Sequence, residues 1–310
     1  MSFVRRLLPL PLGLLLLSGC AVSETTAGAG DGPLTVYATT GYLADAVATI
    51  APDAEVTTMV GPGGDPHTYQ PSTRDIETMR SADLVLWNGL HLEAQMIDQL
   101  ESLGERQLAV GDLLPEELLL PLPETDHAGR PLHDPHIWNS PAAWGKVIDH
   151  IAERLAELSP DHAADYLANA AGYRAEFSEL DAWTTALLAE IPEPRILVTG
   201  HDAFGYFGRT YDLEVRATDF ISTEAALSAT ELSELADYIV EHEVPVIFQD
   251  NQANPQAVTS LREAVEARGW TVTVSTEELF ADSLGPTAPV DTHLGVFEHN
   301  ATVVAEALVR

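Results

Sequence analysis

The stretch LTVYATTGYLADAVATIAPDAEVTTMVG, residues 34–61, contains a β-branched run, a run with helical spacing and a second β-branched run. These features predict a strand, a helix and another strand in that order. A predicted helix at about 73–80 and the apolar run ADLVLWNG at 82–89 continue the alternation. Strands that alternate with helices of this length are typical of a parallel α/β sheet, which we therefore expect in this part of the chain.

The same alternation begins again after residue 192. Four short apolar runs predict strands, and the segments between them predict helices such as Thr230–Glu241 and Ala257–Arg268. We therefore expect a second α/β lobe, again with a mostly parallel sheet flanked by helices. The four runs are RILVTG (195–200), LEVRAT (213–218), VPVIFQD (244–250) and WTVTVS (270–275).

A proline-rich loop over Leu118–Ser140 and a long helical tract over 141–191 separate these two patterns. Pro160 must interrupt the tract, because proline lacks the backbone donor and clashes with the preceding turn. The second part, 161–191, would be on the order of 45 Å long as a helix, which predicts that it connects two lobes. Its apolar residues recur at spacings of three and four and form one stripe: Tyr166, Ala170, Tyr173, Phe177, Leu180, Trp183 and Leu187.

These patterns divide the chain into an N-terminal lobe (34–160), a linking helix (161–191) and a C-terminal lobe (192–310).

The segment before residue 34 does not show the α/β pattern. A charged start, MSFVRR, precedes the apolar run LLPLPLGLLLL and the small residues of LSGC, which predicts a secretory signal peptide at 1–19. The apolar run is too short to span a membrane.

Cys20 is the only cysteine and directly follows the predicted signal peptide. The sequence LSGC, 17–20, resembles the lipobox of bacterial lipoproteins, so we expect Cys20 to carry a lipid anchor and 20–33 to form a flexible tether. The alternative is an ordinary signal peptide and a buried free thiol. A single cysteine excludes an intramolecular disulfide.

The chain is strongly acidic, with 48 acidic and 15 basic residues and a formal net charge of −33. This charge argues against nucleic acid or an anionic membrane surface as a partner. We interpret it as an adaptation for solubility or salt, with a cation-collecting surface as the alternative. The mature chain, about 290 residues, is long enough for one large or two medium domains with a real core.

Four metal-competent side chains follow turn or loop signals. His67 and His136 each follow the dipeptide Asp-Pro, His201 follows a strand that ends in glycine, and Asp291 follows a loop rich in glycine and proline. Proline restricts the backbone beside each of the first two histidines, and the carboxyl ends of α/β strands face the ligand site. For any one of these histidines, simple solvation in a loop is the alternative.

Three imidazoles and one carboxylate would form a closed four-coordinate site. This ligand set suits Zn²⁺, whereas Mn²⁺ is the alternative if the carboxylate binds through both oxygens. Asp65 and Asp134, two positions before their histidines, are placed to cap a helix or to orient a ring nitrogen. A nearby acid such as Asp202 would offset the remaining positive charge of a bound divalent cation.

Four segments resemble motifs of one known family, the zinc- and manganese-binding lipoproteins of bacterial metal ABC importers (TroA-like metal solute-binding proteins). The resemblance covers the chain from the lipobox to the C-terminus. It implies His67, His136, His201 and Asp291 as the metal ligands, with Asn300 ending the helix that follows Asp291. The motifs are GPGGDPHTYQPSTRD (61–75), HDPHIWNSP (133–141), GHDAFGYFGRTYDLEV (200–215) and DTHLGVFEHN (291–300).

The resemblance implies two α/β lobes joined by one long rigid helix, with the metal in the interlobe cleft. It also implies a monomeric extracytoplasmic receptor, not an enzyme, that delivers its metal to a membrane permease. The long helix is expected to limit closure of the lobes to a few degrees.

The remaining candidates have two interpretations each. His127 and His133 lie in the proline-rich loop, where they are either solvated or accessory metal-capturing residues. His293 stands where the family usually has tyrosine, so contact with the metal is one interpretation. Tyr69 either closes the cleft over the site or packs in the core, and we expect Trp138 to pack beneath its loop.

Two other classes of function use the same features. A secreted zinc hydrolase would keep three protein ligands and an open position for water. No His-Glu-x-x-His signature supports it, but it would gain support if Asp291 pointed away from the metal. A surface adhesin would share the fold and the anchor, and zinc would not raise its melting temperature. The metal-receptor hypothesis is therefore favoured, with zinc preferred over manganese.

Overall fold

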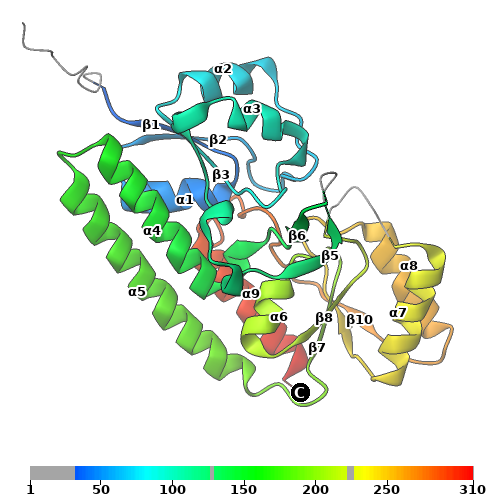
Figure 1. The fold of residues 1–310 in the computed structure, drawn as a ribbon. Helices are drawn as coiled ribbons and strands as arrows, with labels where there is room; N and C mark the ends of the chain where they lie inside the picture. The colour runs from blue at the N-terminus through cyan, green and yellow to red at the C-terminus, as the bar shows by residue number, and fades with distance from the viewer. Residues whose placement is uncertain (1–31, 126–128, 222–226, 310) are drawn as a thin grey trace, which may run out of the picture. The chain divides into compact units, whose positions relative to one another are not determined.

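Two four-stranded parallel sheets form the framework of the chain (Figure 1). The computed structural model describes residues 32–125, 129–221 and 227–309. In the N-terminal lobe the strand order is β2-β1-β3-β4, and in the C-terminal lobe it is β10-β9-β7-β8. The strands are β1 (Thr35–Ala38), β2 (Glu55–Thr58), β3 (Leu84–Trp87), β4 (Gln107–Ala109), β7 (Ile196–Thr199), β8 (Glu214–Ala217), β9 (Val246–Ile247) and β10 (Thr273–Val274).

Both faces of each sheet are covered, as expected for parallel sheets whose strands are linked through helices. In β3, Leu84 and Leu86 enter one core cluster, whereas Val85 and Trp87 enter another on the opposite face. The covering helices are α1 (Gly41–Ile50), α2 (Thr73–Ser81), α3 (Ile97–Glu101), α6 (Gly205–Tyr211), α7 (Ala229–Glu241), α8 (Pro255–Glu266) and α9 (His293–Leu308). The predicted two-lobe α/β fold class is thus confirmed.

The long helical tract consists of α4 (Pro141–Leu158) and α5 (Ala163–Leu188), with Pro160 between them. At 1.5 Å per residue, the 26 residues of α5 span about 39 Å. The helix packs against α1 and α4 along one part of its length and against α6 and α9 along another (Figure 1).

The stripe predicted along α5 is buried in its first half, whereas in its second half Leu180 and Leu187 are only partly buried against the core. Phe177 is buried as predicted, but Trp183 is 40 % exposed, and the buried positions beyond are Thr184 and Leu188. The helical period of 3.6 residues explains the difference, because 177, 184 and 188 share one face. Trp183 and Leu187 each lie one position before Thr184 and Leu188, so their side chains are rotated by about 100° from the buried face.

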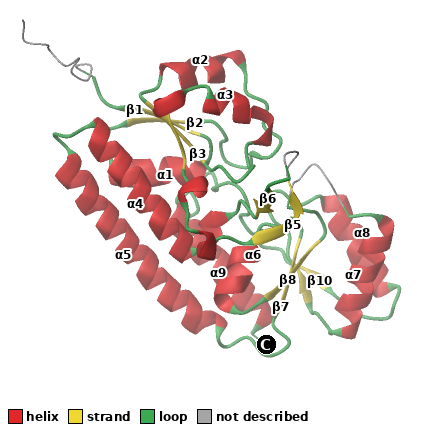
Figure 2. Cartoon of the chain, in the orientation of Figure 1, coloured by secondary structure: helices red, strands yellow, loops and turns green. Residues whose placement is uncertain are grey.

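The proline-rich segment contains more structure than the loop that we predicted. β5 (Pro121–Thr125) and β6 (Pro131–His133) pair antiparallel and form a two-stranded ribbon (Figure 2). Each strand begins with a proline, a position at which the missing backbone donor disturbs the ladder least, and β5 contains a second proline, Pro123. Short 3₁₀ turns lie at Ala94–Met96, Gly104–Arg106, Gly111–Leu113, Glu116–Leu118 and Ile137–Asn139.

The predicted signal peptide, Cys20 and nearly all of the predicted tether lie outside the described residues, as does His127. Residues 1–31 and 32–310 are separate units by their internal contacts, and only the second is described. Within that second unit, no helix is both long enough and apolar enough to cross a membrane.

A buried acid lies where β3 ends. The Glu93 carboxylate accepts hydrogen bonds from the Thr39 hydroxyl (2.6 Å) and from the backbone N–H groups of Asn88 (2.8 Å) and Gly89 (3.2 Å). Burial raises the pKa of Glu93 to about 7 in spite of these bonds. The folded protein therefore keeps a proton on Glu93 at pH values where the unfolded chain has lost it.

This proton gives the stability of the fold a pH dependence. Because the folded pKa of Glu93 lies above its unfolded value of 4.5, the contribution of Glu93 to stability is lost as pH rises from about 4.5 to 7. We expect the difference in unfolding free energy between wild type and Glu93→Gln to fall by roughly 3 kcal/mol across this window. Urea denaturation at pH 4.5 and 7.5 measures it. Exposed Glu77 on α2 provides the control, Glu77→Gln, and a pH-independent difference for Glu93→Gln would contradict the assignment.

Candidate metal centre

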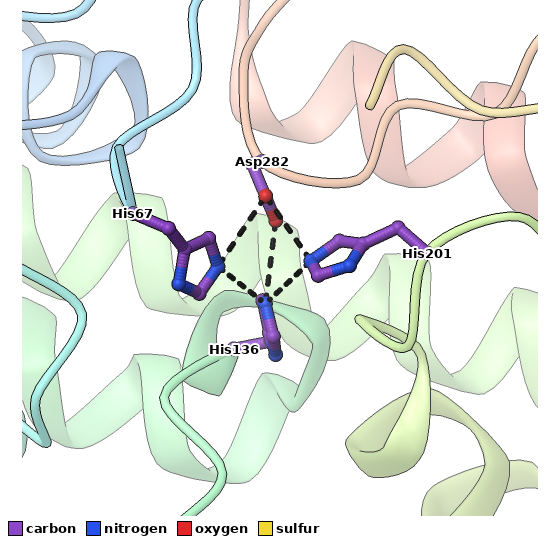
Figure 3. Close-up of side chains that lie close together, drawn as sticks. All are labelled: His67, His136, His201 and Asp282. Carbon is purple, nitrogen blue, oxygen red and sulfur yellow. Dashed lines mark hydrogen bonds and ion pairs between the residues drawn. The ribbon is translucent and has the colours of Figure 1, made fainter. Parts of the chain in front are cut away.

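His67 lies in the turn that follows β2, and Asp65 closes this turn. Asp65 accepts hydrogen bonds from the backbone N–H of His67 (2.8 Å) and from the Thr68 hydroxyl (2.8 Å). The carboxylate therefore caps the turn around Pro66, whereas a helix cap or a contact with a ring nitrogen was predicted for it. His67 is buried, and its ring is directed toward the cluster of ligand atoms drawn in Figure 3.

Asp134 acts on His136 in two ways. It accepts one hydrogen bond from the backbone N–H of His136 (2.9 Å) and another from the ring Nδ1 (2.7 Å). Because a carboxylate only accepts, Nδ1 carries the hydrogen and Nε2 is left with its lone pair for a ligand. Both side chains are buried, so the ring has a fixed orientation.

His201 follows β7 and is held by groups from two other segments. Its backbone N–H donates to Asp250 (2.8 Å), and its ring Nδ1 donates to the carbonyl of Phe220 (3.0 Å). Gly200 has no room for a side chain, because a Cβ there would collide with Ala253. These contacts place Nε2 of a third imidazole beside the first two.

The three imidazoles meet one carboxylate, that of Asp282, in a buried cluster (Figure 3). Nε2 of His136 lies 3.2 Å from Nε2 of both His67 and His201. The Asp282 oxygens lie 3.5 Å from His67, 3.4 Å from His136 and 3.2 Å from His201. All four ligand atoms lie within 4.8 Å of one another.

These separations suit a cation at the centre of the cluster. A regular tetrahedron around zinc with bonds of about 2.0–2.1 Å has edges of about 3.3–3.4 Å, close to the spacings found here. Both oxygens of Asp282 are fully buried without a hydrogen-bond donor in the part of the chain that the structure describes. Such oxygens are costly in a protein interior unless a cation neutralises them. The donor set therefore fits a divalent metal.

The carboxylate is not the one that we predicted. Asp291 is exposed, precedes the N-cap of α9, Thr292, and lines a separate cavity with Asp45. Asp282 lies in the irregular segment after β10, the last strand of the C-terminal sheet. No local signal marks it, because Asp282 lies eight residues beyond the end of β10 and has neither a proline nor a histidine beside it.

Two asparagines of the C-terminal lobe hold the Asp282 segment. Asn300 accepts a hydrogen bond from the N–H of Phe280 (2.9 Å) and donates one to its carbonyl (2.9 Å). Asn251 accepts from the N–H of Ala281 (2.8 Å) and donates to the carbonyl of Ser283 (3.0 Å). Asn300 was expected to end a helix, but α9 continues to Leu308. Its role is instead to fix the backbone two residues before Asp282.

Residues 36–307 match the model of the family described as "ZnuA: Zinc-uptake complex component A periplasmic". The chain belongs to this family. Its similarity to the zinc- and manganese-binding lipoproteins, indicated by the sequence motifs, is thereby confirmed.

Relatives of this zinc-uptake family member carry names with different metals. It is 36% identical over 287 residues to the zinc-binding protein TroA of Treponema pallidum, covering 91% of each chain. It is 34% identical over 297 residues to the manganese-binding lipoprotein MntA of Bacillus subtilis, covering 94% of this chain and 95% of that one. The solved structure of periplasmic TroA superimposes with a TM-score of 0.85, covering 90% of this chain and all of that one.

The charges within the cluster of this family member are strongly coupled. Burial opposes ionisation of Asp282, but the charge of His201, and after it the charges of His136 and His67, hold the pKa of Asp282 well below its usual range. Burial likewise opposes a charge on His201, but Asp282, and after it Asp250, raise the pKa of His201 to about 9. Burial lowers the pKa of His67 to about 4. The opposite charges of His201 and Asp282 therefore stabilise each other inside the buried cluster.

The other predicted residues of the site lie around the four ligands. Asp202 and His67 line one cavity of about 550 Å³, and burial together with the charge of Asp134 raises the pKa of Asp202. The Tyr69 hydroxyl donates to Asp75 (3.0 Å), and its ring packs against a core cluster of the N-terminal lobe. Core packing, one of the two interpretations of Tyr69, is therefore what the structure supports.

The two described histidines with a predicted accessory role are both outside the cluster. Nε2 of His133 lies 3.0 Å from the carboxylate of Glu116, and the side chain lines the same cavity as His67. His293 is fully buried among aromatic rings, and its Nε2 donates to the carbonyl of Trp138 (2.9 Å). His293 therefore packs in the interior and does not face the other imidazoles.

Proposed function

We propose that this protein is an extracytoplasmic solute-binding lipoprotein that captures a divalent transition metal and delivers it to the membrane permease of an ABC importer. The observation that carries the proposal is the buried set of four convergent ligand atoms from His67, His136, His201 and Asp282. Membership of the zinc-uptake family supports it independently.

The arrangement of the ligands explains how capture and release would work. His67 and His136 come from the N-terminal lobe, whereas His201 and Asp282 come from the C-terminal lobe (Figure 3). A cation bound to all four side chains ties the two lobes together, and separating the lobes removes two ligands at once. Release to a permease therefore requires only a small displacement of one lobe from the other.

Zinc is the metal that the ligand set favours. Three imidazoles and one carboxylate are typical of a tetrahedral zinc site, and the affinity of such ligands for divalent metals is higher for zinc than for manganese. Manganese is the alternative, because both Asp282 oxygens face the imidazoles and can bind one ion together. With zinc bound, three neutral imidazoles and one carboxylate leave a net charge near +1.

The remaining parts of the proposal concern the protein outside its metal site. We infer a signal peptide at 1–19, a lipid on Cys20 that anchors the protein to the cell membrane, and a tether at 20–33. A monomer with lobes at 34–160 and 192–310, linked through 161–191, is the arrangement that we propose. The lipobox motif and the name of the MntA lipoprotein support the anchor.

A zinc hydrolase is the less favoured function. A catalytic zinc keeps one position for water, whereas four protein ligands fill a tetrahedral site. Asp282 supplies the fourth ligand in place of Asp291. The position of Asp291 away from the cluster therefore leaves no open site for water.

Metal content and competition test this proposal. We expect one metal ion per chain in protein purified from its host, and we expect zinc to displace manganese in equilibrium dialysis. We expect His201→Ala to reduce the affinity for zinc, because it removes one of four ligands. Metal-free wild-type protein that takes up no zinc, or His201→Ala with unchanged stoichiometry and affinity, would contradict the proposal.

A further inference from the structure

Trp138, two residues after the proposed ligand His136, is bound through both its side chain and its backbone to segments from the C-terminal part of the chain. Its indole N–H donates to the carbonyl of Ala281 (2.8 Å), the residue directly before Asp282. Its own carbonyl accepts from Nε2 of His293 (2.9 Å), the first residue of α9. Trp138 is 1 % exposed, so water does not compete for either bond.

Tyr42, in the first turn of α1, reinforces the contact with Ala281. Its ring stacks on Trp138 with centroids 4.9 Å apart and planes inclined by 16°. Its hydroxyl donates to the same Ala281 carbonyl (3.2 Å). One carbonyl of the C-terminal lobe therefore accepts from two aromatic side chains of the N-terminal lobe.

His293 completes the arrangement from the side of α9. Its ring makes edge contacts with Tyr42, Trp144 and Phe177, at centroid distances of 4.7–4.8 Å. Burial lowers the pKa of His293 to about 3, so the ring is neutral and has one N–H, which the Trp138 carbonyl accepts. Tyr42 therefore packs over the ring of Trp138, and His293 donates a hydrogen bond to its carbonyl.

We propose that Trp138 is a positioning residue for Asp282 and a latch between the lobes. It lies two residues from one ligand and bonds to the neighbour of another, so it fixes the separation of His136 and Asp282 across the lobe boundary. The asparagines that hold the Asp282 segment belong to the C-terminal lobe and cannot do this. The latch must open whenever the ligands separate, and it therefore slows release of the metal. This inference rests on the proposed metal-binding function.

The substitution Trp138→Phe tests the latch, since it keeps an aromatic ring and removes the indole N–H. We expect the zinc dissociation rate, measured with a chromophoric chelator, to rise about fivefold to tenfold, the effect of losing one buried hydrogen bond. We also expect the visible absorption spectrum of the Co²⁺-loaded protein to change, because Asp282 is no longer held at its distance from His136. A loss of general stability alone would not alter that spectrum.

Trp270→Phe is the matched control. It makes the same chemical change away from the metal centre, because the Trp270 indole N–H donates to the backbone carbonyl of Val244 (2.8 Å) and its ring packs against a different core cluster of the C-terminal lobe. We expect both its zinc dissociation rate and its Co²⁺ spectrum to match those of wild type. Tyr42→Phe removes the weaker donor and should change both readouts in the same direction as Trp138→Phe, by a smaller factor.

The outcomes separate the latch from the function on which it rests. If wild type and Trp270→Phe bind neither Zn²⁺ nor Co²⁺, the metal-binding proposal fails. If both bind, and folded Trp138→Phe shows wild-type dissociation and spectrum, the latch is wrong. If Trp138→Phe does not fold, Tyr42→Phe provides the test. A Tyr42→Phe protein with the zinc dissociation rate and the Co²⁺ spectrum of wild type would then overturn the latch.

Discussion

Replacing Asp282 with asparagine is expected to weaken zinc binding by roughly 10²–10³-fold. Four-ligand zinc sites in small proteins have binding free energies of about 10–16 kcal/mol, so one ligand contributes on the order of 3–4 kcal/mol. Asparagine keeps the size of the side chain but removes the charge that balances the cation. Competition with a chelator of known affinity measures the change.

Asp291→Asn is the control for this substitution, because it makes the same chemical change nine residues away on an exposed side chain. We expect its zinc affinity to equal that of wild type. If Asp291→Asn loses affinity and Asp282→Asn keeps it, the ligand predicted from the sequence motif is correct and the cluster of Figure 3 is not the metal site.

Zinc is expected to raise the melting temperature of the metal-free protein by roughly 8 °C when free zinc is about 1,000 times the dissociation constant. At that ratio the ligand stabilises the folded state by about 4 kcal/mol. A protein of this size gains about 2 °C for each kcal/mol. Zinc stabilises the folded state and not the unfolded chain, because only the folded chain brings the four ligands together.

Differential scanning calorimetry with buffered zinc measures this shift. Asp282→Asn should show a much smaller shift at the same free zinc, and Asp291→Asn should show the full one. An unchanged melting temperature in wild type at saturating zinc would favour the adhesin hypothesis, which shares the fold but needs no metal.

Much of the fold could be predicted because local patterns and tertiary structure agree. The strand and helix of residues 34–61 depend on short-range spacing, as does the break at Pro160. β4 was missed because its three residues are each half-buried and carry no apolar run. The ribbon of β5 and β6 was missed because its prolines indicate a loop, and only pairing between the two strands makes them regular.

The sequence could predict those ligands of the site that lie in local turns. Asp-Pro-His is a local motif in which the acid binds the backbone of its own histidine, so His67 and His136 were found. Asp282 has no such signal. Its position depends on Asn251, Asn300 and Trp138, which are 18 to 144 residues away in the chain, and on hydrogen bonds that no spacing rule describes.

His293 is a different case, because the sequence left its contact with the metal open. A histidine at the start of a helix beside an expected ligand, Asp291, is a reasonable metal candidate from sequence. The structure directs its ring into an aromatic interior, where a neutral imidazole donates one hydrogen bond to the backbone. Its residue type gave the chemistry but not the direction of the side chain.

Anomalous diffraction at the zinc absorption edge, from crystals of the zinc-loaded protein, tests the central claim most directly. The account predicts one strong peak per chain, about 2.0–2.2 Å from Nε2 of His67, His136 and His201 and from an oxygen of Asp282. A peak coordinated by Asp291, or no peak among the three imidazoles, would contradict it.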